Sequence, residues 1–266
     1  MIPTPFRYHR ARTLSEAETL LAASPEAKLL AGGQTLIAAM KMRLARPSDL
    51  VDISGLKELC FVRTNGDALV VGAGATHHDV ANSSEVRRVL PALAELAEGI
   101  GDPAVRHLGT LGGTVANNDP TADYPAALLA LGATVKTNRR AIAADEFFTG
   151  MYLTALEDGE IVTAVSFPVP ERACYRKFRN PASHYAMAGV FVARTLTGVR
   201  VAVTGAASCF FRVREMENAL TKEFSPSALN GIAVDRNGLN SDIHASADYR
   251  AHLVSVMAKR AVEALA

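Results

Sequence analysis

Two glycine pairs, each followed by polar side chains, are the clearest candidates for binding chemistry in this sequence. The first lies in Ala31-Gly32-Gly33-Gln34-Thr35, where a short apolar run gives way to a segment of helical character. Successive glycines permit a turn with positive φ, so that several backbone N–H groups can point at one anion. A helix N-terminus directly after the turn adds partial positive charge, which favours a phosphate or pyrophosphate. Taken alone, however, this fragment fits an ordinary strand-to-helix turn better.

The second pair, Gly112-Gly113, lies in a segment from Thr110 to Asp123 that is dense in hydroxyl, amide and carboxylate groups. Thr110 and Thr114 can donate hydrogen bonds to phosphate oxygens, and ionised Asp123 suits the hydroxyl groups of a ribityl chain or ribose. A polar surface loop is the alternative, but such loops rarely carry so much glycine between apolar neighbours. Two glycine-pair loops can hold one pyrophosphate from two sides, which favours a dinucleotide over a mononucleotide.

Other nucleotide and metal motifs are missing from the sequence. There is no G-x-x-x-x-G-K-[ST] phosphate loop, and the one G-x-G, Gly72-Ala73-Gly74, has His77 in place of the third glycine of a dinucleotide fingerprint. His77 and His78 have no acidic or cysteine partners at ligand spacing, so we expect no metal site. Three cysteines are too widely spaced for a zinc or iron–sulfur cluster: Cys60, Cys174 and Cys209. We expect no catalytic nucleophile or general base either.

Composition narrows the class of protein. The chain has 266 residues, of which 49% are hydrophobic and 21% charged, as in an ordinary globular protein. A net charge of +1 gives no electrostatic reason to expect nucleic acid or an anionic membrane as partner. The richest apolar stretch, Pro125 to Val135, is too short to span a bilayer, and the N-terminus lacks the apolar core of a signal peptide. A cytoplasmic location is the expectation.

The elements that must position the two loops follow from periodicity. Apolar runs predict strands at 27–31, 49–53, 133–137 and 160–167, and Asn65-Gly66 predicts a tight hairpin turn between 59–63 and 68–71. Helices are expected at 14–21, 35–44, 85–98 with a break at Pro91, and 124–131, whereas 99–123 reads as a long functional loop. Pro168-Val169-Pro170 is the best domain boundary. Beyond it, alternating valines predict a strand at 199–203 with one buried face, and the chain ends in a helix. The fold class is α+β.

The loops and their surroundings resemble the FAD-binding (medium) subunit of the molybdenum hydroxylases, a family that includes the flavoprotein subunits of carbon monoxide dehydrogenase and xanthine dehydrogenase. In that family an A-G-G-[QH]-[ST] loop and a T-[IL]-G-G loop grip the FAD pyrophosphate. The similarity extends over essentially the whole chain, through Pro5-Phe6-x-Tyr8, Lys28 to Lys41, Arg43 to Pro47, Val51-Asp52-Ile53, Ile100 to Pro103, Ala122 to Leu131 and Ser246 to Arg250. It is weakest from Cys209 to Asp242, and Thr114 stands where many relatives have Ser, Asn or Asp.

The resemblance implies a fold and a cofactor, FAD. Residues 1–170 are expected to form a two-subdomain FAD-binding module of the vanillyl-alcohol-oxidase/PCMH type, with subdomains about 1–56 and 57–170. Residues 171–266 are expected to form the C-terminal α+β domain. The implied cofactor-binding residues are Lys28, Leu30, Ala31, Gly32, Gly33, Gln34, Thr35, Leu36, Ile100, Thr110, Gly112, Gly113, Thr114, Asn117, Asp123, Val162, Lys177 and Tyr185.

Roles within that set also follow from the resemblance. The two loops would hold the pyrophosphate and Asp123 the ribityl or ribose region, while Lys177 and Tyr185 would lie near the isoalloxazine ring. A tyrosine ring can cover a flavin face, and a lysine can stabilise negative charge on the reduced flavin. Without the resemblance, Tyr185 would be interpreted as a core aromatic at the start of a strand.

The implied function is electron transfer within a larger oxidoreductase. A large partner with a molybdenum cofactor would oxidise substrate, and a small partner with [2Fe-2S] clusters would pass electrons through FAD to an external acceptor. The assembly would be a hetero-oligomer, with a dimer of heterotrimers as one form. Two alternatives are a free-standing FAD-dependent oxidoreductase and a non-catalytic nucleotide-binding module. The substrate (carbon monoxide, purine, aldehyde or N-heterocycle) and the acceptor (NAD, oxygen or quinone) stay open.

Overall fold

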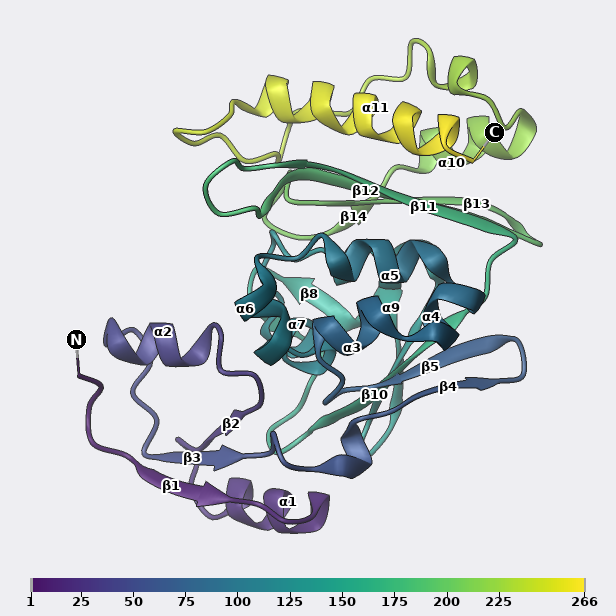
Figure 1. Ribbon diagram of the computed structural model, residues 1–266. Helices are drawn as coiled ribbons and strands as arrows, with labels where there is room; N and C mark the ends of the chain where they lie inside the picture. Colours follow the sequence, from purple (N-terminus) through teal and green to yellow (C-terminus); the bar gives the residue numbers. More distant parts are fainter. Residues whose placement is uncertain (1, 266) are drawn as a thin grey trace.

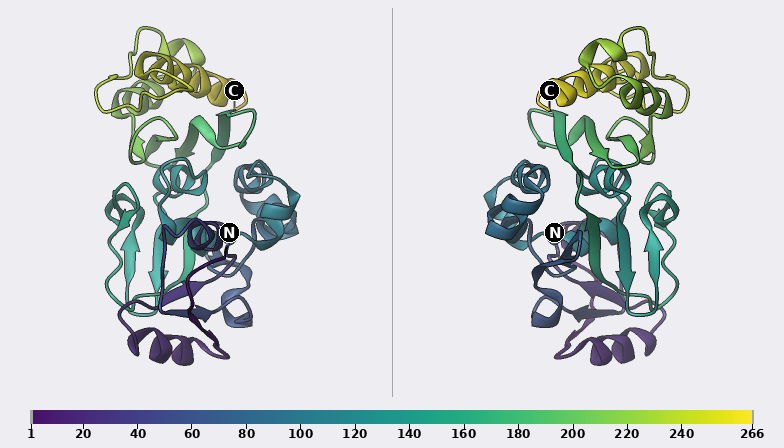
Figure 2. Two further views of the ribbon diagram at one scale, coloured as in Figure 1. Left: turned by 90° about the vertical axis from the view of Figure 1, so that its left-hand side faces the viewer. Right: turned by 90° about the vertical axis from the view of Figure 1, so that its right-hand side faces the viewer.

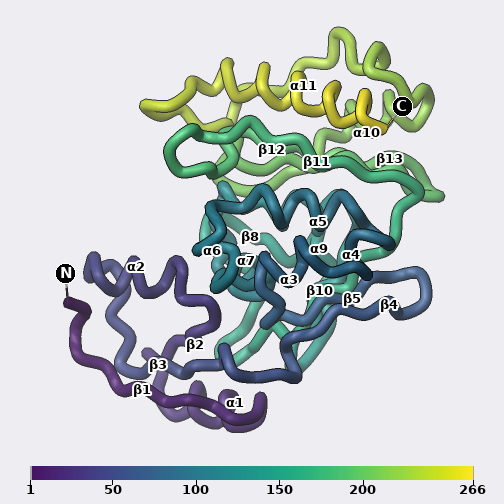
Figure 3. Tube along the Cα trace, in the orientation of Figure 1, coloured from purple at the N-terminus to yellow at the C-terminus, as the bar shows by residue number. Residues whose placement is uncertain are grey.

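Three large sheets follow one another along the chain in the computed structural model, which describes residues 2–265 (Figure 1). The trace in Figure 3 shows the first segment (purple) beside the middle part (blue to teal), with the last third (green to yellow) stacked on the far side of the middle part. Helices and strands are mixed throughout, which confirms the predicted α+β class.

The N-terminal part is a small parallel sheet of order β1-β3-β2 with a helix in each connection. Its elements are β1 (Arg7–Arg10), α1 (Leu14–Ala22), β2 (Lys28–Leu30), α2 (Leu36–Lys41) and β3 (Asp49–Asp52). Thr13 caps α1 by accepting a hydrogen bond from the backbone N–H of Glu16, as the capping-box spacing predicts. The core of this part is small, and Ile161 from the middle part completes it.

The middle part is built on an antiparallel sheet of order β4-β5-β10-β6-β7. Its strands are β4 (Val62–Asn65), β5 (Ala68–Gly72), β6 (Thr134–Thr137), β7 (Ala141–Ala143) and β10 (Val162–Pro168), and β8 (Phe148–Gly150) and β9 (Leu153–Thr154) form a separate pair. The predicted hairpin at Asn65-Gly66 is confirmed, with Gly66 at a positive φ of 62°.

Helices surround this sheet. They are the turn η1 (Lys57–Leu59), α3 (His77–Asn82), α4 (Ser84–Val89), α5 (Pro91–Glu98), α6 (Pro103–Leu108), α7 (Leu111–Asn117), α8 (Tyr124–Leu131) and α9 (Ala144–Phe147). Pro91 begins α5, so the predicted break is confirmed. The expectation of an irregular loop at 99–123 is wrong, because α6 and α7 lie within it. Side chains of Asp102 and Thr110 cap these helices, which are too short to show a clear period.

The C-terminal part is an antiparallel sheet with helices on its outer face. Its elements are β11 (Arg172–Arg179), β12 (Ala186–Thr195), β13 (Gly198–Thr204), β14 (Phe211–Arg212), α10 (Arg214–Lys222), η2 (Pro226–Leu229) and α11 (Ala247–Glu263). The side views show α11 over one face of this sheet, while α5 and α8 pack on the other (Figure 2). The predicted strand at 199–203 is confirmed as β13, but the prediction of a single buried face holds only at its start. Further along, Ala202 is buried on the inner face of the sheet, and Val201 and Val203 are buried on the outer face.

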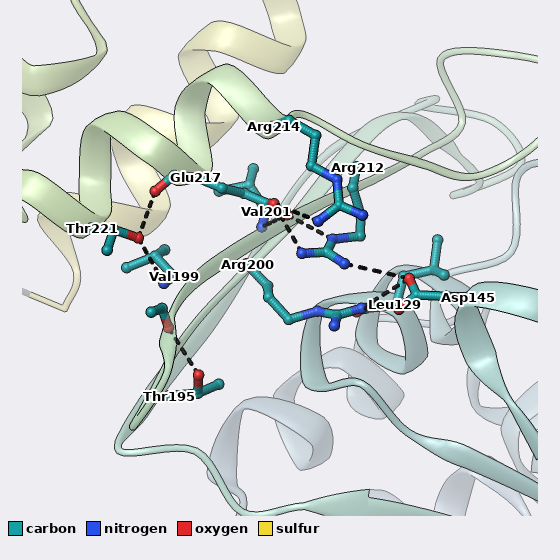
Figure 4. A network of polar contacts seen from close by, with 11 residues as sticks. Leu129, Asp145, Thr195, Val199, Arg200, Val201, Arg212, Arg214, Glu217 and Thr221 are labelled. Atoms are coloured by element: carbon teal, nitrogen blue, oxygen red, sulfur yellow. Dashed lines mark hydrogen bonds and ion pairs between the residues drawn. The ribbon is translucent and has the colours of Figure 1, made fainter.

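Helix α8 is buried along its whole length because it lies between the middle and C-terminal sheets. A polar cluster beside it ties the two parts together (Figure 4). Arg200 on β13 donates to the Leu129 carbonyl at 2.9 Å and pairs with Asp145 of α9 at 2.7 Å. Arg212 lies 3.5 Å from the same carboxylate and forms a bidentate pair with buried Glu217. Through these contacts, the C-terminal sheet is anchored to the part of the chain that carries the second glycine loop.

Candidate functional site

The two glycine loops lie against each other although they are distant in sequence. Gly32 packs so closely on the backbone before α7 that a Cβ there would lie 2.8 Å from the Cα of Gly109 and overlap the Leu108 carbonyl. A Cβ on Gly113 would lie 4.0 Å from the Cβ of Ala31. The fold therefore brings the loop after β2 to the first turn of α7, the arrangement that a ligand held from two sides requires.

The first loop presents a run of unpaired amides. Within residues 2–265, no acceptor is found for the backbone N–H groups of residues 32–36. Hydrogen-bonded amides begin just after this run. The N–H of Ile37 donates to the Gly33 carbonyl, and that of Ala39 donates to the Thr35 carbonyl. Gly33 has a φ of 70°, which turns the chain as the glycine pair predicts. Successive free amides at such a turn form a concavity suited to an anion.

The second loop differs, because its amides are already used. The N–H of Leu111 donates to the Ala75 carbonyl at 3.0 Å, and that of Gly112 donates to the Ala73 carbonyl at 2.9 Å. Gly112 is required for this packing, since a Cβ there would lie 2.5 Å from the Ala73 Cβ. This loop therefore contributes its surface rather than its N–H groups.

That surface is made by Thr110, Gly113 and Thr114. The Thr110 hydroxyl accepts the N–H of Gly113 at 3.1 Å and caps α7, which leaves its own proton free to donate. Gly113 is exposed and borders the first loop at Ala31, and Thr114, the next residue of α7, is half-buried. The two glycine pairs, equivalent in sequence, have different structural roles.

A buried ion pair lies at the start of α8. The Lys177 ammonium is 3.0 Å and 3.1 Å from the two carboxylate oxygens of Asp123, and both side chains are 5% exposed. Lys177 also donates to the Gly99 carbonyl at 2.9 Å. Tyr175 donates to Asp123 at 2.5 Å. Burial raises the pKa of Asp123 against the opposing attraction of Lys177, so the carboxylate depends on these partners to stay ionised.

The sequence predictions placed Asp123 and Lys177 at different parts of one ligand, and the structure joins them directly. Tyr175 was not among the predicted residues. The alternation of strand side chains carries a signal for it, because Tyr175 and Lys177 are two apart on β11 and share a face.

Two exposed tyrosines stand near this pair. Tyr185, in the turn before β12, is 54% exposed, so the interpretation of a core aromatic is wrong. Tyr152 is 55% exposed and donates to Asp119 at 3.3 Å. The pKa of Tyr185 is raised, first by partial burial of its side chain and then by the charges of Asp119 and Asp123. His184 precedes Tyr185 at a positive φ of 60° and turns the chain there.

A cavity of about 440 Å³ opens beside the ion pair, between the end of α5, the start of α6 and the β11–β12 turn. Its lining includes the Gly99 backbone, which accepts from Lys177. It also carries charged side chains of both signs, basic (Arg106, Arg179 and His184) and acidic (Glu95, Glu98 and Asp102). Arg106 is fixed by donating to the carbonyls of Ile100 and Gly101.

The other predicted residues fall into two groups. Six border the loops or the cavity and are exposed or half-buried: Lys28, Leu30, Gln34, Thr35, Leu36 and Ile100. Asn117, at the end of α7, is half-buried as well. Val162 is buried in β10 and belongs to the main hydrophobic core, where its visible role is packing.

Two family descriptions match the chain. Residues 4–170 match the FAD binding domain in molybdopterin dehydrogenase, and residues 173–265 match the CO dehydrogenase flavoprotein C-terminal domain. The chain belongs to the flavoprotein, or medium, subunits of the molybdenum hydroxylases. The family predicted from the glycine loops is confirmed.

Full-length relatives agree. This medium subunit is 36% identical to the carbon monoxide dehydrogenase medium chain of Afipia carboxidovorans, over 99% of this chain and 97% of the relative. It is 34% identical to the glyceraldehyde dehydrogenase medium chain of Sulfolobus acidocaldarius, over 100% of both. It is also 35% identical to the nicotine 6-hydroxylase medium subunit of Paenarthrobacter nicotinovorans, over 96% of this chain and 95% of the relative.

Solved structures share the whole fold. Reconstituted CO dehydrogenase from Oligotropha carboxidovorans superposes with a TM-score of 0.91 at 34% identity, over 99% of this chain and 98% of that one. Quinoline 2-oxidoreductase from Pseudomonas putida gives a TM-score of 0.91 at 28% identity, over the same shares of both chains.

The medium subunit is thus an oxidoreductase subunit whose cofactor is FAD, as predicted. The residues present fit that cofactor. FAD carries an anionic pyrophosphate, and the five free amides of residues 32–36 form a concavity that such a group can fill. In residues 2–265, no helix is both long and apolar enough to cross a membrane.

Proposed function

We propose that this medium subunit works with a large subunit that holds a molybdenum cofactor and a small subunit that holds [2Fe-2S] clusters. Bound FAD supplies the redox chemistry, receiving electrons from the clusters and delivering them to an external acceptor. Support comes from the relatives, which are named medium chains or medium subunits, and from a similar solved structure described as a Cu,Mo-CO dehydrogenase. A hetero-oligomer is the assembly we infer.

The free amides of residues 32–36, set against the surface of Gly113, are the observation that carries this proposal. The first loop binds the FAD pyrophosphate through backbone N–H groups. Thr110 and Thr114 donate hydrogen bonds to it from their hydroxyl groups on the other side. The Asp123–Lys177 pair holds the ribityl region and places a positive charge beside the flavin. Tyr185 covers one face of the ring. The remaining residues predicted from the sequence complete the surroundings of these groups.

We also propose the domain limits stated above, residues 1–170 with subdomains about 1–56 and 57–170, followed by residues 171–266. Each of the three large sheets falls within one of these spans, which supports the division. The two family matches also meet between residues 170 and 173.

Purification of the chain alone and with its partners tests the function. The isolated chain should bind FAD and pass electrons from an artificial donor to an artificial acceptor, yet oxidise no organic substrate. Acid precipitation should release all of the flavin as FAD, because amides, hydroxyls and an ion pair form no covalent link. Native purification should recover molybdenum and iron in the same fraction. Turnover of a small substrate by the single chain would instead support the free-standing flavoenzyme.

A further inference from the structure

Tyr175 is buried, with 7% of its surface exposed, and within residues 2–265 its hydroxyl has one partner, the Asp123 carboxylate that also binds Lys177. The hydroxyl and the ammonium meet the same oxygen of Asp123, at 2.5 Å and 3.0 Å. The carboxylate is therefore held from one strand by two donors of different kinds. Lys177 contacts both carboxylate oxygens, and Tyr175 adds a second donor to one of them, which further restricts rotation of the carboxylate.

Gly189 on β12 makes room for the Tyr175 hydroxyl. It is paired in register with Lys177, and a Cβ at this position would overlap the Tyr175 hydroxyl and lie 2.8 Å from the Thr204 side chain. Its φ is not in the left-handed region, so backbone conformation does not require glycine here. Glycine is required at position 189 because the Tyr175 hydroxyl approaches it so closely.

The surroundings of Asp123 explain why a second donor matters. Burial opposes the charged form of this carboxyl, and Lys177, Tyr175 and Arg179 of β11 oppose that effect. The other titratable groups facing it are Tyr124 of its own helix and Tyr185 of the β11–β12 turn. Removing the Tyr175 hydrogen bond should therefore raise the pKa of Asp123 further, because one of the effects that oppose burial is lost.

We propose that Tyr175, with its hydroxyl accommodated by Gly189, is a positioning residue for FAD: it orients the Asp123 carboxylate and thereby the Lys177 ammonium. This inference rests on the proposed function, in which those two groups meet the cofactor. Tyr175 itself need not touch FAD. Its effect passes through the carboxylate, so it should appear in FAD affinity and in the pH dependence of that affinity.

Two tyrosine-to-phenylalanine variants of the full chain form a matched pair. Tyr175→Phe removes a hydroxyl that donates to Asp123. Tyr124→Phe removes a hydroxyl that is also buried but has no partner within the described chain. FAD is titrated into each apoprotein, from mildly acidic to mildly alkaline pH, and followed by the quenching of flavin fluorescence. We expect Tyr175→Phe to bind FAD about tenfold more weakly, a typical effect of losing a hydrogen bond to a charged group.

The pH profile separates positioning from simple destabilisation. In Tyr175→Phe, affinity should fall further as pH is lowered, because Asp123 takes up a proton at a higher pH when one donor is lost. The wild type and Tyr124→Phe should show a smaller fall over the same range. Gly189→Ala, which keeps the hydroxyl but displaces it, should reproduce the weaker binding and serves as the second variant if Tyr175→Phe folds poorly.

Asp123→Asn distinguishes the failure of this inference from that of the proposed site. If Asp123→Asn binds FAD as the wild type does, the assignment of the site is wrong. If Asp123→Asn binds weakly while Tyr175→Phe and Gly189→Ala match the wild type at every pH, the site stands and the positioning role of Tyr175 is refuted.

Discussion

Gly33 and Gly113 both border the contact between the two glycine loops, but a side chain is disfavoured at each position for a different reason. At Gly33 the backbone has positive φ and the Ile37 side chain lies 2.7 Å from a Cβ position. At Gly113 the backbone is helical and the position is exposed, but a Cβ there would lie 2.9 Å from the Thr110 Oγ1 that caps α7 and 4.0 Å from the Cβ of Ala31. Gly33→Val should therefore lose both FAD and about 1–2 kcal/mol of folding free energy, whereas Gly113→Val should lose FAD and at most about 1 kcal/mol, because it displaces the cap.

The measurement is the ratio of flavin to protein after purification, together with urea unfolding of each apoprotein. Gly66→Val is the matched control for backbone strain, since Gly66 has a φ of 62° with open space around it and lies in the β4–β5 turn. It should lose stability and keep FAD. Full flavin occupancy in Gly113→Val would show that this loop does not face the pyrophosphate.

His77 makes the stability of this region depend on pH. The ring is 3% exposed, its Nδ1 has no partner within the described chain, and its backbone N–H donates to the carbonyl of Gly109. Burial, followed by the charge of Arg106, lowers the pKa of His77 from 6.5 to about 4. As pH falls through this interval the unfolded chain binds a proton that the folded chain rejects, so His77 lowers stability progressively from about pH 6.5 to about pH 4.

We expect His77 to account for about 3 kcal/mol of lost stability over that range. The free energy of urea unfolding, measured at both ends of the range, should therefore change less in His77→Leu than in the wild type. His252→Leu, at an exposed position on α11, should retain the dependence of the wild type. Identical pH dependence in His77→Leu and the wild type would contradict the buried, neutral histidine.

At the scale of elements, α7 links stability to the binding surface through its cap. The Thr110 hydroxyl accepts the Gly113 N–H, and no other side chain in residues 2–265 caps this helix. Thr110→Ala should cost about 1 kcal/mol of stability and weaken FAD binding, because the first turn that carries Gly113 loses its anchor. Thr110→Ser retains the hydroxyl and should restore both. If Thr110→Ala left FAD affinity unchanged, the second loop would have to bind through other groups.

At the scale of the whole molecule, the contact between the middle and C-terminal parts decides whether Lys177 and Asp123 can meet, because they come from different parts. Asp145 lies in this contact and is bound by two arginines. Burial opposes its charged form, yet Arg200 and Arg212 outweigh that effect and lower its pKa. Asp145→Ala leaves Arg200 and Arg212 without that partner at the contact.

We expect Asp145→Ala to lower the free energy of unfolding by about 1–2 kcal/mol, less than for a fully buried pair because the aspartate is partly exposed. Glu157→Ala is the control, since Glu157 pairs with arginines on the open surface at 3.3 Å and 4.0 Å. Its loss should cost about 0.5 kcal/mol or less. Equal costs for the two variants, by urea unfolding, would show that the contact is held by apolar packing alone.

Local features of the sequence were enough to predict many elements of this fold. Asn65-Gly66 produced a hairpin because its turn chemistry is local, and Pro91 began a new helix because its ring excludes the preceding hydrogen bond. The free amides after β2 likewise follow from the glycine pair. Helices α6 and α7 were missed because six or seven residues show too little of a helical period.

Only the tertiary structure decided how these pieces combine. The two glycine pairs look equivalent in sequence. In the second, the Gly112 amide donates to the Ala73 carbonyl and the Gly113 amide to the Thr110 hydroxyl, whereas the amides of the first have no acceptor within residues 2–265. The pairing of Asp123 with Lys177, and the place of Tyr175 beside them, depend on how α8 packs against β12 and β13, which brings Asp123 at its start to the side chains of β11. Asp123 lies 52 positions from Tyr175 and 54 from Lys177 in the sequence, and burial of a helix between two sheets brings the three residues together. Periodicity and motifs report on a few neighbouring residues, whereas contacts of this kind depend on which apolar faces pack together.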